Sequence, residues 1–180
     1  MGLFDLLRRK PKPMPVEGIT SIAAAGDALS SAGLNFSGKA GICLQAPEGG
    51  RAGPSKLDMT GLLVTGALPA RYELADDEYG CTWVILQGDL NGVATAAATV
   101  CRRLNDARYG GDILCIAFEF NEKGRKAYWI YDRDGRFYPF APEGTEHDVR
   151  YELHMKDIVT DILPVENAVS KWYPLWGMPF

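Results

Sequence analysis

The chain has 180 residues, of which 47% are hydrophobic and 23% charged, as expected for one globular domain that buries its own core. The net charge of −4 excludes a typical nucleic-acid-binding domain, because such domains are basic. No stretch reaches the length of about 18 apolar residues needed for a membrane-spanning helix. The N-terminal apolar residues precede the basic ones, which is the reverse of a secretory signal, so we expect a cytoplasmic protein.

The first ten residues predict a short amphipathic helix, here called the head. Its apolar residues are Leu3, Phe4, Leu6 and Leu7, and its basic residues are Arg8, Arg9 and Lys10. Three prolines between Pro11 and Pro15 predict an extended linker after it. We therefore expect a head and linker over residues 1–15 and a single domain over residues 16–180.

The head contains both apolar and basic residues, whereas the rest of the protein has a net negative charge. An anionic bilayer attracts each basic residue near it by about 1 kcal/mol. The head therefore predicts weak, peripheral contact with the inner membrane face or with a partner. A frayed terminus, or one docked on the body, is the alternative.

The first half of the body mixes helical and strand patterns. The expected elements are a helix over 19–32, a strand over 39–46, a glycine-rich loop over 47–54, a short helix over 55–64, and hairpin strands over 71–75 and 81–87. Ser55 is the expected N-cap of the short helix. Asp89 is expected to cap the clearest helix, over 90–107, which has an apolar face.

The second half of the body is dominated by hairpins. The expected strands cover 113–120, 126–132 and 136–140, a break follows at 142–144, and a last helix runs over 148–163 until Pro164. Sequential hairpins flanked by helices predict an α+β fold with a mainly antiparallel sheet and helices packed on it, not a doubly wound parallel sheet.

The chain ends in an aromatic segment, residues 171–180, here called the tail. Its aromatic residues are Trp172, Tyr173, Trp176 and Phe180, and Pro174 and Pro179 prevent a regular helix. One interpretation is that the tail lies along the body and closes one side of the core. The other is that these four residues contact a protein partner, since Trp and Tyr are favoured at the centres of interfaces.

The sequence offers no catalytic, cofactor-binding or metal-binding motif. The two histidines, His147 and His154, are expected in a loop and in the last helix, and an enzyme would have to gather them with an acid such as Asp77 in a cleft. The acidic clusters lie in predicted turns, where carboxylates cap their own backbone. The glycine-rich loop lacks the order of a phosphate-binding loop.

The four cysteines form no Cys-x-x-Cys pair. Cys43, Cys81 and Cys115 lie in runs typical of buried strands, and Cys101 lies in a predicted helix. We expect them to act as small buried hydrophobic residues. A scattered zinc site is the weaker alternative, because such sites usually draw on closely spaced ligand pairs.

Several segments together carry a family resemblance. They are the start at 1–5, residues 38–43, Asp-Glu-Tyr-Gly-Cys-Thr-Trp at 77–83, residues 111–115, Phe-Tyr-Pro-Phe-Ala-Pro at 137–142, residues 163–166, and Trp-Tyr-Pro-Leu-Trp at 172–176. In this order they resemble PspAB, the PspA-associated proteins of bacteria and archaea. The loop at 47–54 and the alanine-rich helix after Asp89 depart from that pattern.

The resemblance implies a cellular context. It implies association with PspA, the membrane-binding coat protein of the phage-shock response, or with a membrane-bound HtpX-like peptidase, and so a role in envelope stress. It carries no catalytic residues. The first hypothesis is a non-enzymatic accessory or adaptor protein that acts through protein contacts. The alternative is a sensor that binds a small molecule or peptide in a pocket lined by Trp83, Tyr128 and Tyr138.

Overall fold

A computed structural model describes residues 12–45 and 53–180. Its centre is a six-stranded antiparallel sheet in the order β2-β3-β1-β4-β5-β6. The strands are β1 (Asn35–Leu44), β2 (Arg71–Asp76), β3 (Thr82–Gln87), β4 (Ile113–Glu122), β5 (Arg125–Tyr131) and β6 (Phe137–Phe140). A separate hairpin pairs β7 (Pro142–Glu143) with β8 (Glu146–His147). The α+β prediction is confirmed.

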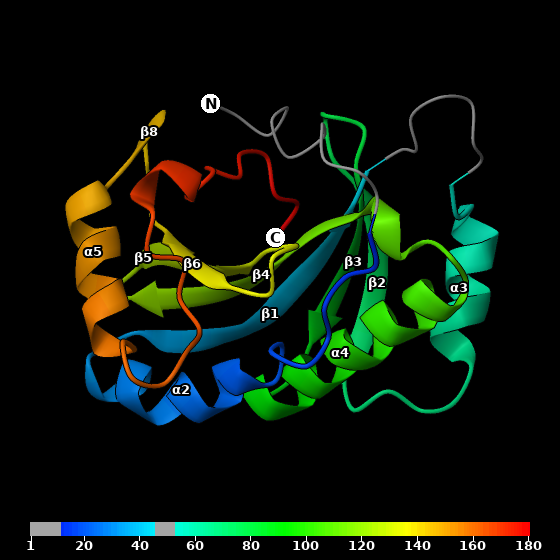
Figure 1. Ribbon diagram of the computed structural model, residues 1–180, viewed down its shortest axis with the longest axis horizontal. Helices are drawn as coiled ribbons and strands as arrows, with labels where there is room; N and C mark the ends of the chain where they lie inside the picture. Colours follow the sequence, from blue (N-terminus) through cyan, green and yellow to red (C-terminus); the bar gives the residue numbers. More distant parts are fainter. Residues whose placement is uncertain (1–11, 46–52) are drawn as a thin grey trace.

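Four α-helices surround the sheet in the part of the chain that is described: α2 (Ser21–Ser31), α3 (Lys56–Val64), α4 (Leu90–Asp106) and α5 (Val149–Ile158). Short 3-10 helices cover Gly110–Asp112 (η1) and Val169–Lys171 (η2). Figure 1 shows α2 and α4 against one side of the sheet and the C-terminal segment, in red, on the opposite side. The sheet is therefore covered on both faces.

Strand β1 joins the two halves of the sheet. Its residue Ile42 pairs with Val84 of β3 on one side and with Ile116 of β4 on the other. The pairing with β4 shifts register between Phe36 and Ala40, where Gly38 adopts a φ of 87°. A positive φ is accessible to glycine at little cost, so Gly38 lets the strand change register without breaking.

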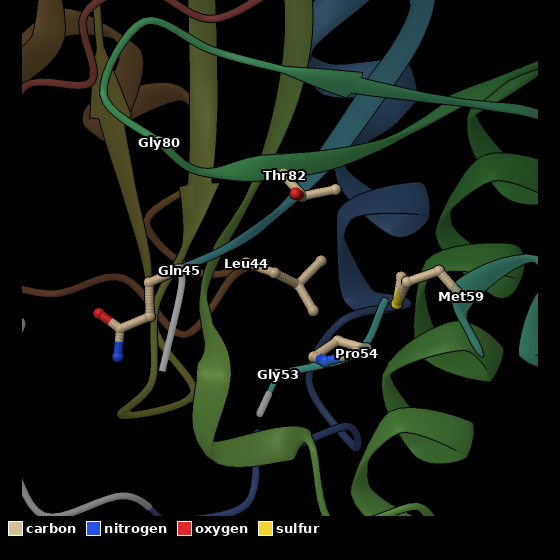
Figure 2. Close-up of a pocket in the computed structure, with 7 residues that line it drawn as sticks. All are labelled: Leu44, Gln45, Gly53, Pro54, Met59, Gly80 and Thr82. Atoms are coloured by element: carbon tan, nitrogen blue, oxygen red, sulfur yellow. The ribbon is translucent and has the colours of Figure 1, made fainter. Parts of the chain in front are cut away.

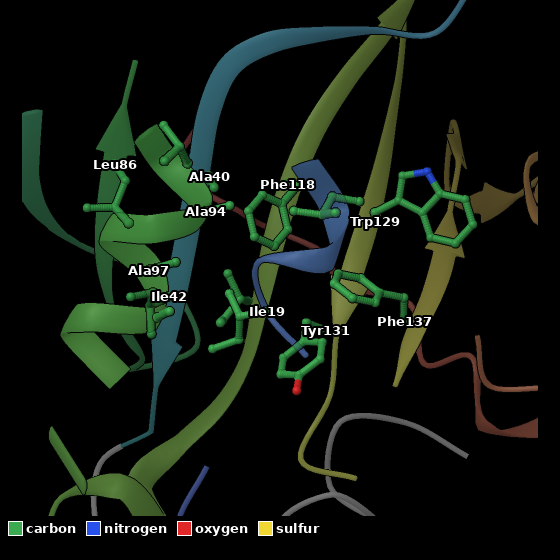
Figure 3. Packing of buried hydrophobic residues seen from close by; sticks show 14 of the residues in the cluster. Ile19, Ala40, Ile42, Leu86, Ala94, Ala97, Phe118, Trp129, Tyr131 and Phe137 are labelled. Atoms are coloured by element: carbon green, nitrogen blue, oxygen red, sulfur yellow. The ribbon is translucent and has the colours of Figure 1, made fainter. Parts of the chain in front are cut away.

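Two cores result from this arrangement. The larger core lies between the sheet and the helices, and Figure 3 shows Ala94 and Ala97 of α4 beside Ala40 and Ile42 of β1. Small side chains let a helix approach a sheet closely. The second core lies on the opposite face, where Trp172 and Leu175 of the tail pack over sheet residues.

Three differences from the sequence-based expectations stand out, beyond shifts of one or two residues at other element ends. The last helix ends at Ile158 rather than Leu163, because the backbone turns at Val159, whose carbonyl accepts hydrogen bonds from the amides of Ile162 and Leu163. The expected break at 142–144 is the start of the β7–β8 hairpin, turning at Gly144. Strand β1 begins at Asn35, four residues before the predicted start.

The head, residues 1–10, lies outside the described residues, and so does the loop at 46–52. The described end of the linker is fixed to the body. Met14 is buried in the larger core, and its backbone N–H and C=O both hydrogen-bond to the Asn105 amide, at 3.0 and 2.8 Å. The carbonyl of Lys12 accepts from Arg133 at 3.1 Å. The division of the chain at residue 15 stays a prediction.

Within residues 12–45 and 53–180, none of the helices combines the length and the hydropathy that crossing a bilayer requires.

Candidate functional site

The tail is anchored on the sheet by its buried residues. The indole N–H of Trp172 donates to the carbonyl of Glu166 at 2.9 Å, and Trp172 and Leu175 are 5% and 4% exposed. The hydroxyl of Tyr138, on β6, donates to the carbonyl of Tyr173 at 3.1 Å. Since a buried Trp or Tyr needs a partner for its polar atom, these bonds fix where the tail lies.

The end of the tail rests on the centre of the sheet. The ring of Phe180 lies over Gly41 of β1 and meets the rings of Trp83 and Tyr128 edge-on, at centroid distances of 5.7 and 6.3 Å. A Cβ atom at residue 41 would overlap the Phe180 ring and lie 2.7 Å from the Trp83 ring. The absence of a side chain at Gly41 therefore creates the seat for Phe180.

The turn between β2 and β3 supports the tail from the side. One oxygen of the Asp77 carboxylate accepts from the backbone amides of Tyr79 and Cys81, each at 2.9 Å. The other oxygen accepts from the Trp83 indole at 2.7 Å. A side chain at Gly177 would collide with Tyr79, so the tail is in close contact with this turn.

We call the accessible apolar residues of this region the tail surface. They are Tyr79, which is 58% exposed, and the half-buried residues Tyr173, Trp176, Met178 and Phe180. Trp176 is held in place by an edge contact with Phe140 at 5.3 Å. The tail thus closes one side of the core and also leaves aromatic edges accessible. That Trp172, Tyr173, Trp176 and Phe180 contact a partner stays a prediction.

The aromatic residues assigned to a sensor pocket are buried in the second core. Trp83, Tyr128 and Tyr138 are 2%, 4% and 1% exposed. Burial raises the pKa of the Tyr128 and Tyr138 hydroxyls, which accordingly stay neutral. The tail fills the space in which a ligand would have to contact these rings.

One pocket of about 200 Å³ lies elsewhere, at the end of β1 and beside α3 (Figure 2). Its lining consists of Leu44, Gln45, Gly53, Pro54, Met59, Gly80 and Thr82. None of the three predicted sensor aromatics is among these residues, and none of the seven is a carboxylate, histidine or lysine. The described part of the lining therefore offers no ready acid or base.

The family comparison covers the whole chain: the family described as PspA associated protein B (PspAB) matches residues 1–180. The chain belongs to the PspAB family. The family name indicates an association with PspA. No curated protein and no solved structure matches the chain.

An active site in this PspAB chain would have to gather His147, His154 and Asp77, but the fold keeps them apart. His147 Nδ1 lies 2.9 Å from both carboxylate oxygens of Glu152, which is fully buried and also accepts from the amide of Ala141. His154 is exposed on α5. Asp77 follows β2, at the sheet edge opposite β6. His147 thus takes part in a contact between the β8 hairpin and α5.

The cysteines of this PspAB chain are all buried and free, as expected of small hydrophobic residues. Cys43, Cys81 and Cys115 share the second core, whereas Cys101 lies in the larger one. Across the described ranges, no three His, Cys, Asp or Glu side chains are placed to hold a metal ion. The sequence predicts each cysteine in its own buried run, and it does not predict that three of them meet. Their places in buried runs were visible in the sequence, but the strand pairing that brings them together was not.

Proposed function

We propose that this PspAB protein is a non-enzymatic accessory protein that binds a PspA-class protein through the tail surface. The observation that carries the proposal is the placement of accessible aromatic edges on a fixed seat: Trp176 is held by Phe140, and Phe180 lies over Gly41. Rigid aromatic side chains lose little entropy when they bind, and they dominate the energy of many interfaces.

The border of the tail surface is acidic. Glu78 is exposed beside Tyr79, and its carboxylate lies close to Gly177 of the tail. An acidic border favours a partner with a basic face, because complementary charges steer association and suppress wrong partners. We therefore expect binding to weaken as the salt concentration rises.

The test is titration calorimetry of the full chain against the PspA-class protein encoded in the same genome. The double variant Tyr173→Ala, Trp176→Ala truncates half-buried residues of the tail surface and leaves Trp172 in place. We expect it to weaken binding at least about tenfold, as expected for an aromatic hot spot. Wild-type affinity in this variant would contradict the proposal for the tail surface.

The matched control is Leu57→Ala. Leu57 is 81% exposed on α3, away from the tail. This variant also removes an accessible apolar side chain, and we expect it to bind as the wild type does. The resemblance also implies an HtpX-like peptidase as a partner. If the wild type binds that peptidase and not the PspA-class protein, the peptidase is the partner.

The head supplies a second contact in this proposal, with the inner face of the membrane. The support is the order of Leu3, Phe4, Leu6 and Leu7 before Arg8, Arg9 and Lys10. We expect deletion of residues 1–10 to abolish co-sedimentation with anionic vesicles and to leave PspA binding unchanged. Equal sedimentation of the deleted and full chains would remove the membrane contact from the proposal.

A further inference from the structure

Three cysteine thiols meet beneath the tail. Cys43 on β1 is paired directly with Cys115 on β4, and Cys81 lies two residues before Trp83, which is the partner of Cys43 on β3. Directly opposed side chains on antiparallel strands have Cβ atoms about 5 Å apart, and diagonal ones lie somewhat further apart. Cys43 thus faces Cys115 directly and Cys81 diagonally, and all three side chains belong to the second core. Cys43 is therefore the centre of the group.

The three thiols differ in access. Cys81 is 6% exposed, whereas Cys43 and Cys115 are 1% and 2% exposed. Cys81 lies at the end of the β2–β3 turn, where its backbone N–H donates to Asp77 and its carbonyl accepts from the Asp77 amide. A small reagent from solvent consequently meets Cys81 before it meets the other two.

The thiols also differ in acidity. The hydrogen bond from Cys43 lowers the pKa of Cys81, against the opposing effects of burial and of the Asp77 carboxylate. The pKa of Cys43 is raised well above its ordinary value by its contacts with Cys115 and Cys81 and by burial. The thiolate is the reactive form of cysteine, so exposure and acidity both favour Cys81 over Cys43 as the thiol that is attacked first.

We propose that Cys81 and Cys43 form an oxidation site for hydroperoxides, with Cys81 as the attacked thiol and Cys43 as the resolving thiol. The Cys81 thiolate attacks the terminal oxygen of the hydroperoxide. An S–O bond forms, the O–O bond breaks, and the leaving alkoxide takes a proton to become an alcohol. The sulfur is oxidised by two electrons, and the O–O bond of the hydroperoxide accepts these two electrons as it breaks.

The second step closes a disulfide. The Cys43 sulfur attacks the sulfenic sulfur of Cys81, an S–S bond forms, and the S–O bond breaks. The hydroxide that leaves takes the proton of the Cys43 thiol and becomes water. Two thiols and one hydroperoxide thus give one disulfide, one alcohol and one water. A neutral oxidant suits the site, because the carboxylate of Asp77 beside Cys81 repels anionic ones.

This inference does not depend on the proposed binding of PspA. The disulfide would form within the core that Trp172 and Leu175 close, directly beneath the tail. The protein would then carry a reversible chemical modification next to its proposed contact surface.

The experiment treats the reduced full chain with one equivalent of hydrogen peroxide, alkylates the remaining thiols and maps the peptides by mass spectrometry. We expect a Cys43–Cys81 cross-linked peptide that dithiothreitol removes. Cys43→Ala should leave a sulfenic acid at Cys81, detected as a dimedone adduct, and Cys81→Ala should give no disulfide. The control Cys101→Ala removes the deeply buried cysteine of the other core and should react as the wild type does.

Three results would overturn the proposal. They are the absence of both the cross-linked peptide and the adduct, oxidation of Cys101 as fast as that of Cys81, and a Cys43–Cys115 disulfide that forms at the wild-type rate in Cys81→Ala. Peptide mapping of the oxidised wild type needs no variant. It therefore tests for the Cys43–Cys81 disulfide even if a substitution prevents folding.

Discussion

Gly41 and Gly61 show how the surroundings of a glycine decide the effect of replacing it. A methyl group at residue 41 would overlap Phe180 and crowd Trp83, whereas a methyl group at residue 61 would meet nothing within 4 Å. Gly61 lies within α3, where glycine is less favourable than alanine by about 0.5–1 kcal/mol.

The two substitutions are therefore expected to have opposite signs. Gly41→Ala should destabilise the protein by about 1–3 kcal/mol and loosen the end of the tail, since overpacking forces neighbours to move. Gly61→Ala should stabilise it by about 0.5–1 kcal/mol. Urea unfolding measures both, and hydrogen exchange of residues 172–180 reports the tail. An equal effect of the two variants would contradict the assigned position of Phe180.

Asp77 is the second residue on which the site depends. Its carboxylate accepts from the amides of Tyr79 and Cys81 and from the Trp83 indole. We expect Asp77→Ala to cost about 2–4 kcal/mol, because it leaves several donors unsatisfied at once. The neighbouring Asp76→Ala is the control. It breaks an exposed ion pair with Lys56, and such pairs contribute at most about 1 kcal/mol. Thermal unfolding of both variants decides whether Asp77 holds the turn.

At the scale of elements, Glu119 ties the central strands together. It lies on β4, its carboxylate accepts from Ser37 of β1 at 2.6 Å, and it pairs with Lys126 of β5 at 2.7 Å. Burial alone would raise the pKa of Glu119, but Lys126, Ser37 and Tyr128 outweigh it and hold the pKa below its ordinary value. The ionised form is thus favoured in the folded protein.

The sign of the resulting pH dependence follows from that shift. A carboxyl group whose folded pKa is depressed stabilises the protein above its unfolded pKa of about 4.3. This contribution is lost as the pH falls through the lower folded pKa. We expect Glu119→Gln to cost about 1–2 kcal/mol at pH 7, and the difference from the wild type to vanish below the folded pKa. Urea unfolding between pH 7 and pH 3 measures this. Glu73→Gln, at an exposed position on β2, is the control. A constant difference across the pH range would be the contrary result.

At the scale of the whole molecule, the tail is part of the folded domain. Trp172 and Leu175 are buried in the second core, and truncating residues of this kind costs about 2–5 kcal/mol each. We expect deletion of residues 172–180 to remove most of the stability of the domain and to cause binding of a hydrophobic dye. Calorimetry and dye fluorescence measure the two effects. A deleted chain that unfolds at the wild-type temperature would show that the second core does not need the tail.

Local features of the fold were predictable because their causes are local. Ser55 and Asp58 form the capping box that starts α3, and Asp89 caps α4 by accepting from the amide of Gly92. Each cap involves residues three apart, so a short stretch of sequence contains the whole signal. The hairpin β4–β5 was predictable for the same reason, since its strands and turn adjoin in the chain.

The candidate site was predictable only in part. The aromatic tail was visible in the sequence, but its seat over Gly41 joins residues 139 positions apart. The grouping of Cys43 with Cys81 and Cys115 likewise depends on the insertion of β1 between β3 and β4. Pairing between distant strands is decided by how the whole sheet buries its two faces, and no local pattern encodes it.

The sequence by itself thus determined the α+β class and most elements, because periodicity, caps and turn residues act over a few positions, and its motifs carried the resemblance to the PspAB family. Only the tertiary structure decided which face each element covers, that Trp172 is buried while Trp176 keeps an accessible edge, and that three thiols meet beneath the tail. These features are contacts between segments far apart in the chain, so they exist only once both cores have formed.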